Sequence, residues 1–159
     1  MIRAAEVLAS DAGHSDTITL SYDDRFRRRM AMTSDGGLAF LLDLGQAVEL
    51  AEGQGLLLED GRIVGIRAAD EPLMEVRAAD PRLLVRSAWH IGNRHLPCAI
   101  HADRLLLRWD HVIAGMLEGL GCGVTRVSAP FEPEGGACGQ GRTQGHEHGH
   151  AQGHHHDHL

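Results

Sequence analysis

Alternating polar and apolar residues dominate the first part of the chain and predict β-strands. Thr17–Tyr22 alternates with a period of two, as a half-buried strand does. Residues 29–42 form two apolar segments around Asp-Gly-Gly, and residues 56–66 form two more around Asp-Gly. Both turn sequences are typical of β-hairpins. Because no segment here keeps a helical period, residues 1–70 are predicted to form a small all-β domain.

The pattern then changes to one in which strands alternate with helices. Asp80 before Pro81 predicts a helix start, and Asp110 predicts a second one. Gly92 is expected to end the first helix in the left-handed conformation. Short strands are predicted at residues 73–77, 98–101, 105–108 and 124–127. The resulting order β-α-β-β-α-β predicts a ferredoxin-like domain over residues 71–136, and therefore an α+β fold.

Residues 137–159, called the C-terminal tail below, have few apolar side chains. Such a segment cannot offset its ordering entropy by burial, so we expect it to be disordered without a ligand. The tail nevertheless holds seven of the 12 histidines of the chain.

Composition excludes several classes of protein. The formal net charge is −7, so a nucleic-acid partner is not expected. The sequence contains neither an apolar run long enough for a membrane helix nor a secretory signal, which predicts a cytoplasmic protein without a membrane partner. All 15 basic residues are arginines, and Arg25 and Arg27–Arg29 form a local basic cluster in this acidic chain.

The histidines of the C-terminal tail predict a metal-binding segment. Neutral imidazole suits Ni²⁺, Cu²⁺, Zn²⁺ and Co²⁺, and a flexible chain can bring several rings around one ion. An expression tag and a solvated tail without a role are the alternatives, but interspersed Gly, Glu and Asp favour metal binding. Because protons compete for imidazole, metal capacity should fall as the pH drops through about 6.5. The candidate ligands in the tail are His146, His148, His150, His154, His155, His156 and His158.

Four histidines before the tail differ in what their positions predict. His95 follows a Gly-Asn pair in a loop, where it is exposed and free to bind metal. His111 lies in the first turn of a helix, where the helix dipole favours the neutral, metal-binding form of imidazole. His90 is expected to pack against its helix, and His101 is expected to point to solvent from a strand.

The three cysteines are too widely spaced for a CxxC metal pair or a disulfide framework. Cys98 and Cys122 lie in apolar segments and are expected to act as small buried hydrophobes. Cys138 precedes the tail histidines, and its thiol is an open candidate for soft-metal binding. The sequence contains no GxSxG, HExxH or Walker-type motif, so no enzymatic activity is predicted.

Three segments together resemble the UreE family of urease accessory nickel metallochaperones. They are Trp89–Pro97 (WHIGNRHLP), Leu107–Gly121 (LRWDHVIAGMLEGLG) and Pro130–Ala137 (PFEPEGGA). A histidine-rich C-terminus strengthens the resemblance, which is close over residues 70–159. The residues before 70 are similar by architecture only, to a chaperone peptide-binding domain.

The resemblance implies a homodimer that carries Ni²⁺ as cargo and delivers it to apo-urease together with accessory proteins that include a GTPase. It also implies that His95 binds nickel at the dimer interface, one from each subunit. Arg108 and Trp109 occupy a stretch where some members carry further histidines, so a peripheral metal site would rest on His111 alone.

Two other functions remain open from the sequence. A general buffer or store for Zn²⁺, Cu²⁺ or Ni²⁺ would use the same tail without a urease client. A peptide-binding folding module would use the β-domain, and its client binding would not depend on the histidines.

Overall fold

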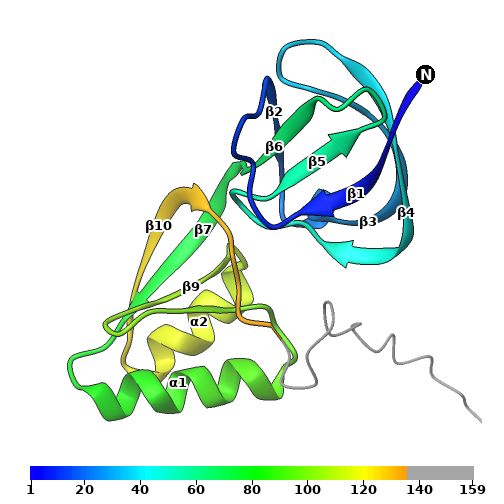
Figure 1. Ribbon diagram of the computed structural model, residues 1–159. Coiled ribbons are helices and arrows are strands. Elements are labelled where there is room, and N and C mark those ends of the chain that lie inside the picture. The colour runs from blue at the N-terminus through cyan, green and yellow to red at the C-terminus, as the bar shows by residue number, and fades with distance from the viewer. Residues whose placement is uncertain (136–159) are drawn as a thin grey trace, which may run out of the picture.

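The computed structural model describes residues 1–135, so the predictions for the C-terminal tail lie outside the described residues. The first part of the chain forms a six-stranded sheet in the order β2-β6-β5-β1-β4-β3 (Figure 1). Its strands are β1 (Ile2–Leu8), β2 (Asp16–Leu20), β3 (Phe26–Thr33), β4 (Ala39–Glu49), β5 (Gly55–Leu58) and β6 (Ile63–Ala68).

Both predicted hairpins of this sheet are confirmed. β3 pairs antiparallel with β4, and Thr33 lies opposite Ala39. β5 pairs antiparallel with β6 around a turn in which Gly61 has a φ of +89°. The strand predicted over Thr17–Tyr22 ends earlier, at Leu20, because a 3-10 helix (Asp23–Arg25) follows it.

The central strand β1 was not predicted as a separate element. It pairs parallel with β4 and antiparallel with β5, yet only one of its seven residues, Ala4, is buried. A strand of this kind lacks the alternation that sequence analysis detects. Besides Ala4, the core of the sheet comes from other strands, and it includes Phe40, Leu42, Leu56, Val64 and Ile66, all fully buried.

The second part of the chain has the predicted element order. β7 (Asp70–Arg77), α1 (Pro81–Asn93), β8 (Ala99–Ile100), β9 (Leu105–Arg108), α2 (His111–Leu120) and β10 (Gly123–Pro130) follow one another. The four strands form an antiparallel sheet in the order β10-β7-β9-β8. Strands β7 and β10 are longer than predicted, and β8 is shorter.

Each face of this second sheet packs against a different layer. On one face Met74 and Leu107 meet Ile91 of α1 and Leu117 of α2, so both helices cover that face. On the other face Leu73 and Leu106 pack with Tyr22 and Phe131. The first sheet is thereby joined to the face that the helices leave open.

Polar side chains fix the starts of both helices as predicted. The Asp80 carboxylate accepts a hydrogen bond from the Leu83 N–H at 2.8 Å. The Asp110 carboxylate accepts from Val112 and Ile113 at 2.8 and 3.2 Å. Gly121 ends α2 with a φ of +103°. Among the described residues, no helix is long and apolar enough to cross a membrane.

Contacts of Tyr22 and Arg25 with Phe131 form the junction between the two sheets. The Tyr22 and Phe131 rings meet edge to face, with centroids 5.1 Å apart. Arg25, which is 1% exposed, donates hydrogen bonds to the carbonyls of Leu20 and Phe131. At the rim of the junction, Arg108 forms an ion pair with Asp23 at 2.9 Å.

Candidate functional site

His95 lies in a tight turn directly after α1. Its backbone φ is +57°, and among residues 1–135 it is the only non-glycine residue with a positive φ. The His95 N–H donates to the Gly92 carbonyl at 3.0 Å, and the Leu96 N–H donates to the Ile91 carbonyl at 3.4 Å. The imidazole is exposed. The turn therefore holds the backbone of His95 while leaving its side chain accessible.

The prediction that Gly92 ends α1 in the left-handed conformation was wrong. Gly92 lies inside the helix, which continues to Asn93. The left-handed residue is His95, three positions later. Left-handed backbone favours glycine because a Cβ approaches the following carbonyl oxygen; other residues adopt it uncommonly, and histidine is among those that do so more often. Strained backbone positions cluster at functional sites.

His95 lines a cavity of about 540 Å³ that opens between the two parts of the chain. The first sheet contributes Glu49, Leu50 and Ala51 to the lining. The segment after β10 contributes Glu132 and Glu134. Three acidic residues and one buried arginine, Arg25, thus line the cavity together with His95. Their summed charge is negative, which favours a bound cation over an anion.

The described chain ends beside His95. The Glu134 N–H donates to the Cys98 carbonyl at 2.9 Å, which ties the segment after β10 to the segment that follows His95. In Figure 1 this segment runs from the end of β10 down toward the end of α1. Gly135 is itself part of the cavity lining. The chain continues from this residue toward the C-terminal tail, which begins at residue 137.

The Cys98 side chain also lines the cavity, but it is half-buried. Burial, with a smaller effect of Glu134, raises the pKa of the Cys98 thiol to about 12. A thiol must lose its proton to act as a strong metal ligand. Cys98 is therefore protonated at neutral pH, as its predicted role as a small apolar residue requires.

The second predicted ligand before the tail, His111, is exposed in the first turn of α2. It is not among the residues that line the His95 cavity. Within residues 1–135, no three His, Cys, Asp or Glu side chains lie close enough together to hold a metal ion. The described part of one chain thus brings neither His95 nor His111 into a complete metal site.

Packing contacts or solvent exposure account for His90, His101 and Cys122, the other described positions singled out from the sequence. His90 is half-buried and meets the Trp89 ring edge to face, with centroids 5.0 Å apart. His101 is exposed as predicted, although it lies in the β8–β9 turn rather than on a strand. Cys122 is buried, with its sulfur 3.1 Å from the Ser87 hydroxyl. Cys138 lies outside the described residues.

Arg108 contacts residues of the junction, and Trp109 contacts strand β10. Besides its ion pair with Asp23, the Arg108 guanidinium lies over the Tyr22 ring, 5.3 Å from its centroid. Arg126 stacks on Trp109 at 4.2 Å. Both side chains are therefore engaged in contacts other than metal binding.

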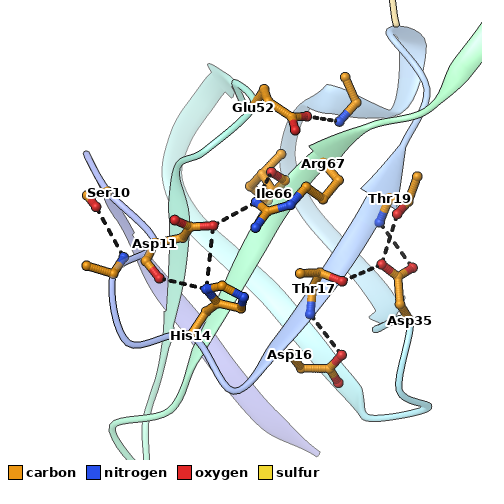
Figure 2. A network of polar contacts seen from close by, with 12 residues as sticks. Ser10, Asp11, His14, Asp16, Thr17, Thr19, Asp35, Glu52, Ile66 and Arg67 are labelled. Carbon is orange, nitrogen blue, oxygen red and sulfur yellow. Dashed lines mark hydrogen bonds and ion pairs between the residues drawn. The ribbon is translucent and has the colours of Figure 1, made fainter. Parts of the chain in front are cut away.

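His14, which sequence reasoning did not single out, belongs to a polar network on the first sheet (Figure 2). Its Nδ1 lies 3.7 Å from the Asp11 carboxylate, which Arg67 contacts at 2.7 Å. The Arg67 hydrogen bond lowers the pKa of Asp11. A neighbouring carboxylate, Asp35, accepts hydrogen bonds from the hydroxyls of Thr17 and Thr19. These contacts tie loops to β2 and β6, which is a structural role.

Comparisons with known proteins cover the whole chain. Residues 1–69 match the family described as UreE urease accessory protein, N-terminal domain, and residues 71–158 match its C-terminal domain. The urease accessory protein UreE of Chelativorans sp. is 57% identical over 163 residues, covering 99% of this chain and 100% of the relative.

Two further relatives carry the same description. The protein of Bradyrhizobium sp. (strain BTAi1) is 53% identical, covering 92% of this chain and 73% of the relative. The protein of Rhodobacter capsulatus is 47% identical, covering 93% and 94%. The chain therefore belongs to the UreE family of urease accessory proteins.

Proposed function

We propose that this protein is a nickel metallochaperone that binds Ni²⁺ and delivers it to apo-urease during assembly of the urease metallocentre. The observation that carries the proposal is the His95 turn. An exposed imidazole is held on a left-handed backbone at an acidic cavity, which is also lined by Gly135, the last described residue before the histidine-rich tail. Metal transfer needs exchangeable ligands, and an exposed imidazole supported by the further imidazoles of the tail provides them.

The site is completed by a second copy of the chain. One His95 is too few for a nickel site, whereas a two-fold axis near the turn brings two of them together. The outer side of α1, the helix that leads into the turn, supports this arrangement. Val85 and Trp89 are 70% and 63% exposed there, although both are large and apolar. Burying such side chains against their symmetry mates would stabilise a homodimer.

The tail histidines then add ligands and capacity. His146, His148, His150, His154, His155, His156 and His158 supply further imidazoles near His95, and His111 serves as an additional weak ligand. Zn²⁺, Cu²⁺ and Co²⁺ suit the same ligands, and Cu²⁺ generally binds them more tightly than Ni²⁺. Selectivity for nickel therefore depends on metal availability and on the partner proteins.

The remaining features of the proposal follow from the family. The partners are urease apoprotein and urease accessory proteins, including a GTPase, and the protein acts in the cytoplasm as a chaperone without enzymatic activity. The chain divides into a β-rich domain (1–70), a metal-binding and dimerisation domain (71–136) and the tail. The strand order β10-β7-β9-β8, with both helices on one face, supports a ferredoxin-like class for the second domain.

Calorimetric titration of the metal-free protein with nickel tests this assignment. His95→Ala should abolish the tight site, whereas deletion of residues 144–159 should mainly lower the number of ions bound. His101→Ala is the matched control, because it removes another exposed imidazole from a turn of the same domain. Cys98→Ser should leave tight binding unchanged, since the thiol is protonated. Unchanged tight binding in His95→Ala would contradict the role given to His95.

A general buffer for divalent metals is the alternative function, favoured by the many tail histidines. Urease activation in a cell that lacks this protein, under limiting nickel, distinguishes the two. The metallochaperone should restore activation and the His95→Ala variant should not. If neither protein changes urease activity while both still bind nickel, the buffer function is supported.

A further inference from the structure

The fold divides the arginine cluster noted in the sequence into two parts. Arg25 is buried in the junction, whereas Arg27, Arg28 and Arg29 lie on β3. β3 is the last strand at one edge of the six-stranded sheet (Figure 1). The proposed nickel function uses none of the three arginines on this edge.

Two of these guanidinium groups are not neutralised within the described part of the chain. Arg27 pairs with Asp24 at 2.8 Å, but no ion pair or side-chain hydrogen bond involves Arg28 or Arg29 among residues 1–135. Arg29 lies opposite Asp43 on β4, yet that carboxylate is bound by Arg3. The β4 residues opposite Arg28, at 44–47, carry no charge. Among the described residues, Arg28 and Arg29 thus place two positive charges without an ion pair at adjacent positions of one edge strand.

The backbone at this edge is available to another strand. β3 pairs with β4 on one side only, so half of its N–H and C=O groups face away from the sheet. Four consecutive residues, from Arg28 to Ala31, are exposed, and Met30 is 39% exposed. Successive side chains of a strand point to opposite faces of the sheet. Arg28 and Arg29 would therefore flank an added strand on both of its faces.

We propose that the β3 edge binds an acidic, extended peptide segment of a partner protein by strand addition. Carboxylates of the segment meet Arg28 and Arg29, and an apolar side chain covers Met30, while the backbones form the ladder hydrogen bonds. A second copy of β3 is a poor occupant, because pairing two such edges brings arginines close to arginines. This partner surface is separate from the nickel site and does not depend on His95.

Fluorescence anisotropy on the full, metal-free chain tests the proposal. The probe is a labelled eight-residue peptide of valine and threonine with two adjacent glutamates at its centre. Exposed ion pairs contribute modestly, so the loss of two of them in Arg28→Gln/Arg29→Gln should weaken binding about tenfold. The control Arg82→Gln/Arg86→Gln removes two exposed arginines that also lack an ion pair within residues 1–135 and should change binding less than about twofold. Circular dichroism verifies that both variants are folded.

Modified probes distinguish strand addition from electrostatic attraction alone. A peptide with lysines in place of the glutamates should not bind, and a peptide N-methylated at alternate residues should lose most of its affinity. Equal binding of the N-methylated peptide would overturn strand addition. Tighter binding of an eight-nucleotide oligothymidylate would overturn the peptide as the partner class. No binding of the glutamate peptide would overturn the proposal. The arginines would then serve only to prevent the β3 edge from pairing with other strands. The probe contains no histidine, so none of these outcomes depends on nickel binding.

Discussion

The junction between the two sheets and the His95 turn border the same cavity but are built in opposite ways. Tyr22 and Arg25 line this cavity from the junction side, and both are buried. His95 lines it from the other side and is exposed. Buried aromatic and guanidinium contacts fix the position of one wall, whereas the imidazole remains accessible to an ion.

If His95 is the nickel ligand, as proposed above, this difference combines a defined site with ligand exchange. If the ligand were buried in a closed cage, release would require local unfolding. If the surroundings were loose, the ligand would not be positioned. Among the described residues, only His95 combines a side chain with a left-handed backbone. The junction on the other side of the cavity is tightly packed, because the Phe131 ring is 0% exposed.

The largest expected effect comes from removing the aromatic centre of the junction. Phe131→Ala should lower the free energy of unfolding by about 3 kcal/mol, because a fully buried ring is lost. Urea denaturation measures the change. The control Ile100→Ala, at a 52% exposed position, should cost less than about 1 kcal/mol. A similar small loss in both variants would show that the junction is not a rigid support.

A smaller effect is expected at the turn itself. His95→Gly and His95→Ala both remove the imidazole, but only glycine adopts a φ of +57° without strain. The glycine variant should therefore be more stable than the alanine variant by about 1 kcal/mol. Thermal and urea denaturation of the pair measure this difference. Equal stability of the two variants would indicate that the backbone at His95 is not strained.

The smallest effect is expected at the rim of the junction. Arg108 and Asp23 form an exposed ion pair at 2.9 Å, and such pairs contribute little. Arg108→Gln should lower stability by about 0.5 kcal/mol, and added salt should reduce that loss. A loss as large as that of Phe131→Ala would mean that charge, rather than aromatic packing, holds the two sheets together.

Features fixed by neighbouring residues were predictable from the sequence. The β5–β6 hairpin follows from its Asp-Gly turn, and the starts of both helices follow from Asp80 and Asp110, whose carboxylates bind backbone N–H groups two or three residues away. These interactions depend on residues adjacent in the chain, so a single sequence contains the information.

Features that depend on distant parts of the chain were not predictable. Strand β1 is stabilised by pairing with β4 and β5 rather than by its own alternation. The cavity requires Glu49 and Glu134, which are far from His95 in the sequence. The left-handed conformation of His95 is an exception, because hydrogen bonds within residues 91–96 fix it locally; it was missed because a glycine at position 92 suggested an earlier stop. The motif around His95 identified the residue but not this geometry.

A calorimetric nickel titration of the His95→Gly variant beside the unmodified protein tests the central claim most directly. Glycine keeps the left-handed turn, so the variant loses the imidazole without disturbing the cavity walls. The account predicts that the tight nickel site disappears while the weaker binding of the tail persists and the unfolding free energy does not fall. Tight nickel binding that persists unchanged in this folded variant would contradict the assignment of His95 as the ligand that defines the site.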